Sequence, residues 1–163
     1  MRNLFTPCAC ALLLAALYTG GGAAVCLAQG APKATASLEK YDEFTEPNCE
    51  EELARMDGFY QHLQNNPDLH GYIVVYGGRT GMHYEALARA ARMRFYLTRT
   101  RGLDGRRLTT IGGGHRETLT VEIWLGRRGE PMPAPTPTLQ TKDLSLKGKA
   151  SLIGYDCGAR LGL

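Results

Sequence analysis

The stretch GYIVVYGGRTG, residues 71–81, decides the fold of this chain. Apolar and β-branched residues follow one another from Tyr72 to Tyr76 with no charged residue between them. A strand of this composition is buried on both faces, so we expect it at the centre of a sheet. The glycines that follow predict a tight turn into the next element. These turn glycines are Gly77, Gly78 and Gly81.

Amphipathic helices are expected on both sides of this strand. In the first, Asn48 is the predicted cap, and three acidic residues, Glu50 to Glu52, complement the positive end of the helix dipole. Its buried stripe is predicted to contain Leu53, Met56, Phe59 or Tyr60, and Leu63. The second helix is expected from about residue 83 to residue 101. Its arginines are predicted to point outward: Arg89, Arg92, Arg99 and Arg101.

Three further strands complete the pattern. Residues 40–44 predict a short edge strand, and residues 107–111 and 118–125 predict two strands separated by the glycine run 112–114. A crossover makes the central strand and the strand at 107–111 parallel, and the last strand is expected to return antiparallel. Residues 40–126 therefore predict an α+β fold, a β-α-β-α-β-β two-layer sandwich in which two helices cover one face of a mixed sheet.

The N-terminus has the pattern of a secretory signal peptide. Arg2 precedes the apolar stretch CACALLLAALY, residues 8–18, and Ala28 follows at a suitable cleavage position. We expect residues 1–28 to be removed and the chain to be periplasmic or secreted. An uncleaved membrane anchor and a lipid-anchored Cys26 are the alternatives, although three glycines inside the span disfavour a continuous membrane helix.

Two segments flank the expected domain. Residues 29–39 are small and polar and predict a linker. Residues 127–138 contain PMPAPTPT, whose alternating prolines forbid a helix and favour an extended spacer. The tail at residues 139–163 has one apolar alternation, so an edge strand and a mobile tail are its two alternatives.

Cleavage would leave two cysteines, Cys49 and Cys157. An even pair in an exported chain predicts one disulfide, which would join the start of the domain to the tail. Two free thiols are the alternative. The sequence has no CxxC or comparable ligand spacing, so we expect neither a metal site nor a cofactor.

Charge argues against one class of function. The chain has 19 basic and 16 acidic side chains, and the loss of Arg2 with the signal peptide leaves 18 basic ones. This near balance argues against a protein that binds nucleic acid through bulk charge. The glycine turn YGGRTG, residues 76–81, also lacks the Gly-Lys-Ser/Thr and GxGxxG patterns of nucleotide-binding loops.

Three stretches together resemble the C-terminal, peptidoglycan-associating domain of the outer-membrane protein A (OmpA-like) family: LQNNPDLHGYIVVYGG, RAARMRFYLTRTRGLDGRRLTTIGGG and TVEIWL. The residues at positions typical of that family are Arg89-Ala90, Tyr96-Leu97, Gly102-Leu103, Arg107-Leu108, Gly112 and Gly114. The resemblance spans roughly residues 40–125. It implies the same α+β fold, a non-enzymatic role in the cell envelope of a diderm bacterium, and a contact with peptidoglycan.

Two ligand-binding positions of that family differ in this chain. The family holds the diaminopimelate of peptidoglycan with an aspartate after the central strand and an arginine before the last strand. Here the matching places read GGRTG, residues 77–81, and ETLT, residues 117–120. The resemblance therefore implies the fold and the envelope setting more than the ligand.

Parallel strands place the loops at 77–83 and 112–117 at one edge of the sheet, where such sheets hold ligands. Arginines near backbone amides at a helix start favour a carboxylate or phosphate, and an acidic residue can accept an ammonium. The sequence thus predicts a site for an anionic or zwitterionic envelope ligand; solvated loop charges on a scaffold are the alternative. Its side chains are Arg79, Thr80, His83, His115, Arg116 and Glu117, with Gly112 and Gly114 as further turn glycines.

Two other functions are alternatives. His83, His115 and Glu117 would serve acid–base chemistry in a small hydrolase, but no serine or cysteine lies in a recognisable nucleophile motif, so we expect no enzyme. The other alternative is a protein–protein interaction module, for which the strand at 40–44 offers an exposed edge and the Pro-rich segment offers reach.

Overall fold

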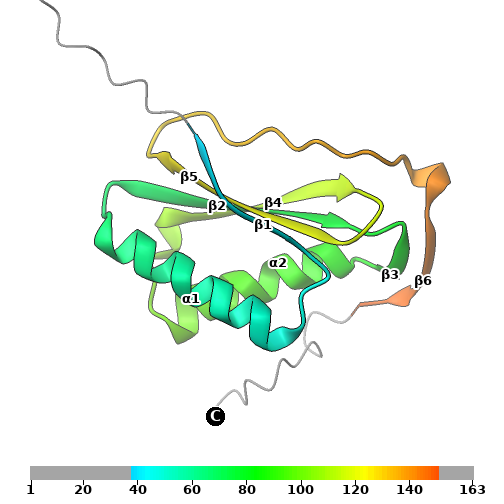
Figure 1. Cartoon of the computed structure of the whole chain (residues 1–163), viewed down its shortest axis with the longest axis horizontal. Helices are drawn as coiled ribbons and strands as arrows, with labels where there is room; N and C mark the ends of the chain where they lie inside the picture. The colour runs from blue at the N-terminus through cyan, green and yellow to red at the C-terminus, as the bar shows by residue number, and fades with distance from the viewer. Residues whose placement is uncertain (1–37, 151–163) are drawn as a thin grey trace, which may run out of the picture. The chain divides into compact units, whose positions relative to one another are not determined.

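A computed structural model describes residues 38–150, which belong to one compact unit (Figure 1). Its elements are β1 (Glu39–Thr45), α1 (Cys49–Asn65), β2 (Leu69–Gly77), β3 (Thr80–His83), α2 (Glu85–Phe95), β4 (Leu108–His115), β5 (Thr120–Arg127) and β6 (Ser145–Lys149). Short helical turns lie at Tyr96–Thr100, Gly105–Arg107 and Thr141–Asp143. The expected signal peptide and most of the expected first linker lie outside the described residues.

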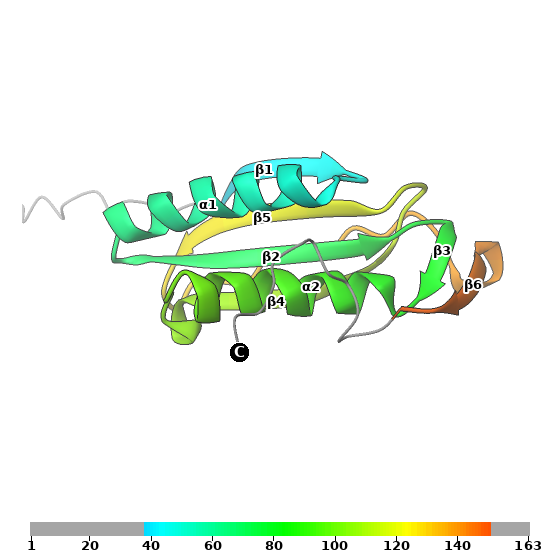
Figure 2. The same cartoon turned by 90° about the horizontal axis from the view of Figure 1, so that it is seen from below.

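Four strands form one mixed sheet in the order β1-β5-β2-β4. β2 pairs in parallel with β4 and antiparallel with β5, and β1 pairs antiparallel with β5. Both helices cover the same face of this sheet (Figure 2). The predicted α+β sandwich, the central strand and the parallel crossover are therefore confirmed.

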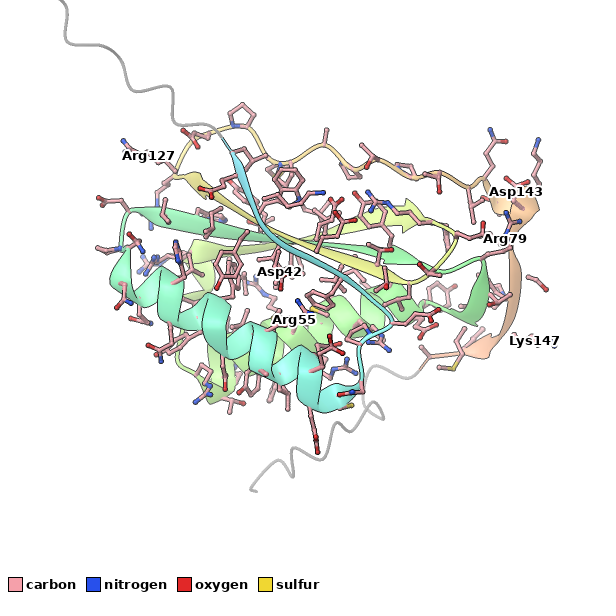
Figure 3. All side chains as sticks on the ribbon, viewed as in Figure 1. Asp42, Arg55, Arg79, Arg127, Asp143 and Lys147 are labelled. Atoms are coloured by element: carbon pink, nitrogen blue, oxygen red, sulfur yellow. The ribbon has the colours of Figure 1, made fainter. Side chains whose placement is uncertain are left out.

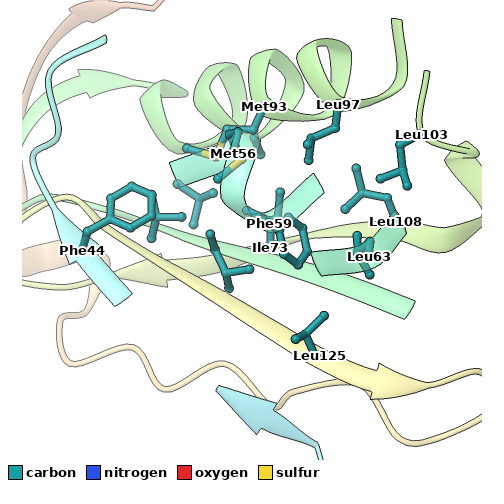
Figure 4. Packing of buried hydrophobic residues seen from close by; sticks show 14 of the residues in the cluster. Phe44, Met56, Phe59, Leu63, Ile73, Met93, Leu97, Leu103, Leu108 and Leu125 are labelled. Atoms are coloured by element: carbon teal, nitrogen blue, oxygen red, sulfur yellow. The ribbon is translucent and has the colours of Figure 1, made fainter. Parts of the chain in front are cut away.

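The hydrophobic core lies between the helices and the sheet (Figure 4). α1 contributes Met56, Phe59 and Leu63, which are fully buried and pack in one cluster with Ile73 of β2. Burial of each such side chain contributes about 1.5–3 kcal/mol relative to exposure. Gly71 of β2 lets the helix approach this closely, because a Cβ at that position would overlap the Phe59 ring.

The start of α1 follows the prediction at its cap and departs from it one turn later. The Asn48 side chain accepts a hydrogen bond from the Glu51 N–H at 2.9 Å, as expected of the cap. Leu53, however, is only half-buried, and Glu52 takes its place in the interior with 1% of its surface exposed. A charged side chain therefore lies inside the contact between the helices.

Two arginines of α2 surround the Glu52 carboxylate. Arg89 donates to it from Nη1 at 3.0 Å, and Arg92 donates from Nη2 at 2.5 Å and from Nε at 3.0 Å. The prediction that these two arginines point outward is wrong, because a buried carboxylate requires cations beside it. The same prediction is confirmed for Arg99 and Arg101, which are exposed.

Two segments predicted as turns are strands. The glycine run 112–114 was expected to separate two strands but lies inside β4, and residues 80–83 form β3. β3 pairs in parallel with β6 as a separate two-stranded sheet. The tail thus supplies a strand, but it pairs with β3 instead of extending the main sheet.

The Pro-rich segment lies along the second face of the main sheet (Figure 1). We call residues 131–139 the strap. The Thr136 N–H donates to the Tyr76 hydroxyl at 3.2 Å, and the Leu139 N–H donates to the His115 carbonyl at 3.1 Å. Tyr76 is fully buried although it points away from the helices. The segment expected to act as a spacer is therefore packed against the domain.

Cys49 begins α1. The expected partner, Cys157, lies outside the described residues. The pairing of these two cysteines therefore stays a prediction.

Glu52→Ala is expected to lower the free energy of unfolding by about 3–5 kcal/mol, because it removes the buried carboxylate that Arg89 and Arg92 contact. Glu51→Ala, at the exposed neighbouring position, is the matched control and should change stability by about 1 kcal/mol or less. Urea unfolding followed by circular dichroism measures both variants. Equal midpoints for the two variants would show that the buried contact contributes nothing.

Candidate functional site

The carboxyl ends of β2 and β4 lie at the same edge of the sheet, and the two loops that follow them meet there. The Arg116 N–H donates to the Gly77 carbonyl at 2.9 Å, and the Arg79 N–H donates to the Glu117 carbonyl at 3.1 Å. The expected meeting of the two loops is therefore confirmed. The side chains of the two loops, however, do not form one group and lie in separate places.

Arg79 and Glu117 pair at the exposed rim of this edge. The guanidinium donates to both carboxylate oxygens of Glu117, from Nε at 2.7 Å and from Nη2 at 2.9 Å. Its Nη1 donates to the Asp143 carbonyl at 3.0 Å, which joins the loops to the segment before β6 (Figure 3). Hydrogen bonding to Arg79 lowers the pKa of Glu117. The charge of this arginine is therefore already matched within the domain.

Arg116 lies on the face of the sheet that is opposite the helices, beside the strap. It donates to the Glu122 carboxylate at 2.8 Å and to the Thr136 hydroxyl at 2.7 Å, and its guanidinium carbon lies 3.7 Å from the centroid of the Tyr76 ring. Burial alone would raise the pKa of Glu122, but hydrogen bonds from Lys40 and Arg116 outweigh it and lower that pKa. The predicted pair of arginines for an anion does not form, because buried Glu122 requires a cation on its own face.

A cavity of about 220 Å³ lies between β3, the start of α2 and the end of β4. Thr80, Glu85 and His115 supply a hydroxyl, a carboxylate and an imidazole to its wall. Larger apolar and aromatic side chains also line it: Val75, Met82, Tyr84, Leu87 and Leu146. Of the predicted site residues, this cavity therefore brings together Thr80 and His115.

His83 lies apart from the cavity lining. Its side chain is exposed, and its backbone carbonyl accepts a hydrogen bond from the Ala150 N–H at 2.9 Å, within the contact between β3 and β6. The predicted grouping of His83 with His115 is therefore wrong, because β3 directs His83 away from the cavity that His115 lines.

The sequence-based prediction missed Glu85. Its Oε2 accepts a hydrogen bond from the Met82 N–H at 3.2 Å, so the carboxylate closes the turn that leads from β3 into α2 and also lines the cavity. The available signal was its place as the first acidic residue after the glycine turn, at the start of a helix.

Two glycines shape the cavity by different means. A Cβ at Gly77 would lie 2.8 Å from Cδ2 of His115, so the absence of a side chain leaves room for the imidazole. Gly81 has a φ of 143°, a conformation that favours glycine. The predicted positive φ is thus confirmed for Gly81, although this residue lies in β3 and not in a turn, whereas Gly77 is required for space.

The cavity suits a small group that carries an amine or hydroxyl beside an apolar part. Glu85 offers an anionic acceptor, and Thr80 and His115 offer hydrogen-bonding groups. Between residues 38 and 150, no three His, Cys, Asp or Glu side chains lie close enough together to hold a metal ion. In the same part of the chain, no helix has the length and apolar character needed to cross a membrane.

No protein-family model and no curated protein matches this sequence. Membership of the OmpA-like family therefore stays a prediction that rests on sequence motifs. The α+β fold agrees with the resemblance, but one fold serves many functions, so the site has to carry the functional argument.

Gly77→Ala is expected to lower the free energy of unfolding by about 1–3 kcal/mol, because the added methyl group would overlap the His115 ring. Gly112→Ala is the control, since a Cβ at Gly112 meets no atom within 4 Å. Thermal unfolding of both variants measures the effect. A wild-type midpoint for Gly77→Ala would show that the imidazole does not need this space.

Acid is expected to weaken the contact between Glu122 and Arg116. The folded pKa of Glu122 lies below its ordinary value of 4.5. Its contribution to stability is therefore complete above about pH 4.5 and is lost as the pH falls through the folded pKa. Glu122→Gln should be less stable than the wild type at neutral pH, and the difference should shrink in acid. Urea unfolding at about pH 7 and about pH 3 measures it; a difference independent of pH would contradict the assignment.

Proposed function

We propose that this chain is an exported, non-enzymatic binding or scaffold protein of the cell envelope, and that its cavity holds part of a peptidoglycan stem peptide. The cavity carries the proposal, because it lies where two parallel strands end and is lined by Glu85, Thr80 and His115. Stem peptides present amines and carboxylates on short aliphatic chains. A small, largely apolar cavity with one carboxylate suits such a group.

Recognition of the ligand's amine would contribute more to binding than recognition of its carboxylate. Among the residues that line the cavity, Glu85 is the acidic one, and its carboxylate would accept the ligand ammonium while the apolar wall contacts the alkyl chain. A ligand carboxylate would have to replace Glu117 on Arg79, which already makes a bidentate pair. The favoured ligand is therefore zwitterionic, with its amine inside the cavity and its carboxylate outside.

The cellular setting is part of the same proposal. The N-terminal pattern, Arg2 followed by the apolar stretch at residues 8–18, favours export. The OmpA-like resemblance implies peptidoglycan as the neighbouring polymer, and one of the two places that carry the family's ligand contacts, residues 77–81, borders this cavity.

A protein–protein interaction module is the second candidate function. α2 leaves two large apolar side chains at the surface, Leu87 with 59% and Phe95 with 44% of the residue exposed. Apolar side chains that gather on one helix face indicate a contact with another chain more often than scattered ones do.

Co-sedimentation with purified peptidoglycan sacculi tests the proposed function. The oxidised mature chain, residues 29–163, is compared with Glu85→Gln and Glu50→Gln. Glutamine at position 85 keeps an acceptor for the Met82 N–H but removes the charge. Glu50 is the matched control, because it is an exposed carboxylate in the first turn of the other helix. We expect the wild type and Glu50→Gln to pellet, and Glu85→Gln to bind at least about tenfold more weakly, the order for a lost charged hydrogen bond.

Two outcomes would contradict this proposal at different levels. Absence of wild-type pelleting would overturn peptidoglycan as the ligand. Equal pelleting of Glu85→Gln would overturn the cavity as the site. Competition with a soluble stem peptide, carrying either a free or an acetylated amine, checks the chemistry, since the acetylated peptide should not compete.

A further inference from the structure

Among residues 38–150, the outer edge of β4 is open along most of its length. The sheet order β1-β5-β2-β4 makes β1 and β4 the two edge strands. From Thr109 to Gly114, β4 pairs with no strand other than β2 in the part of the chain that the structure describes. Only its last residue, His115, has an isolated bridge to Leu139 of the strap. An open edge offers backbone N–H and C=O groups to another strand.

The two edges differ in how they discourage pairing. β1 carries Glu39, Lys40, Asp42 and Glu43, and its register shifts between Lys40 and Asp42. Charges and bulges of this kind protect an edge from pairing with other chains. The β4 segment 109–114 reads TTIGGG and has neither charge nor proline. The edge at 40–44, expected from the sequence to be the exposed one, is thus the protected edge. Within the described part of the chain, β4 is the open edge.

α2 provides an apolar wall beside this edge (Figure 2). Leu87, Ala91 and Phe95 are exposed and recur at intervals of four residues, so they lie along one side of the helix. Leu87 borders the 220 Å³ cavity near the end of β4. Ala91 and Phe95 border a second, shallower hollow of about 540 Å³ that also includes Gly105, just before β4 begins. Two hollows therefore lie along the same helix, one near each end of the open edge.

The two ends of the surface formed by the β4 edge and α2 differ in charge. Arg94 and Arg99 line the second hollow. Arg94 donates to the backbone carbonyls of Leu108 at 2.7 Å and Gly105 at 3.3 Å, and Arg99 is exposed. Across residues 38–150, no salt bridge includes either arginine. The end of the surface where β4 begins is therefore cationic and complements a carboxylate.

We propose that the β4 edge binds the carboxyl-terminal segment of another protein as an added antiparallel strand. Its terminal carboxylate would lie at Arg94 and Arg99, and an apolar side chain further along would enter the cavity beside Gly112. Because β4 begins at the cationic end, a carboxylate there makes the added segment run antiparallel to β4. Strand addition of this kind draws affinity from backbone hydrogen bonds and specificity from side-chain pockets.

Gly112 is central to this arrangement. It lines the cavity and lies on the open strand, and a Cβ built on it meets no atom within 4 Å. A side chain at this position would therefore fill the space that the incoming apolar side chain needs without disturbing the fold. The six residues from Thr109 to Gly114 span about 20 Å, so a segment of similar length matches the edge.

The test uses fluorescein-labelled ten-residue peptides in which valine and threonine alternate. One ends in a free carboxylate, the second is amidated, and the third has a central proline, which removes a backbone N–H. Fluorescence anisotropy with the mature chain measures binding. We expect the free-carboxylate peptide to bind most tightly, amidation to weaken it about fivefold, and the proline to weaken it at least about tenfold.

Two variants and two controls place the peptide. Gly112→Val should weaken binding at least about tenfold, because it fills the cavity, whereas Ile111→Val changes a residue on the other face of the same strand and should bind like the wild type. Arg99→Glu should abolish the difference between free and amidated peptides. Arg128→Glu, an exposed arginine outside both hollows, should retain that difference.

Amide hydrogen exchange then distinguishes the two edges. The peptide should slow exchange within residues 109–114 and leave β1 unchanged. The inference is overturned if no peptide binds, if Gly112→Val binds as the wild type does, or if protection appears on β1. It is also overturned if the peptide binds only after residues 158–163 are removed, since the chain's own end would then hold the edge. The proposed peptide site shares the cavity with the proposed envelope ligand. Arg99 lies outside the cavity, so a variant at Arg99 separates loss of peptide binding from loss of sacculus binding.

Discussion

β2 is buried on both faces, and the arrangement of the domain follows from this constraint. Every residue from Gly71 to Gly77 is buried. β4 and β5 pair with its two sides, the helices cover one face, and the strap covers the other. Without the strap, the Tyr76 hydroxyl would lose the Thr136 N–H that donates to it. The strap therefore covers the second face of the strand, and Arg116 joins the strap residue Thr136 to the buried Glu122.

Local patterns predicted most of the fold. Periodicity located both helices and the main strands, and the apolar run at 72–76 gave the central position of β2. Pairing across long sequence distances was not predictable in this way. Glu52 and Arg89 are 37 residues apart, and a glutamate in the first turn of a helix reads as a solvated charge until its partner is known. The strap was missed because its prolines describe an extended chain and do not indicate which surface that chain contacts. The two-faced burial of β2 was the available signal, since a strand covered by helices on one face needs a second cover.

The position of the candidate site could be predicted from the sequence, but the side chains that form it could not. Parallel pairing of β2 and β4 fixes where their loops meet, and this follows from topology alone. Which side chain reaches the cavity depends on alternation along each strand and on competition for partners. Arg116 lies on the face of Glu122, Arg79 is held by Glu117, and Glu85 enters from the first turn of α2. An inventory of charged loop residues therefore overstated the positive charge available to a ligand.

The strap also determines when the domain can finish folding. Tyr76 and Thr136 are 60 residues apart, and Arg79 and Asp143 are 64 apart, so these contacts close long loops and form slowly. Because synthesis proceeds from the N-terminus, the residues of both helices and of all four strands of the main sheet are synthesised before those of the strap. During that interval the aromatic second face of β2 is uncovered. A nascent chain at this stage has the exposed surface that chaperones bind, and a chain truncated before residue 131 would keep it permanently.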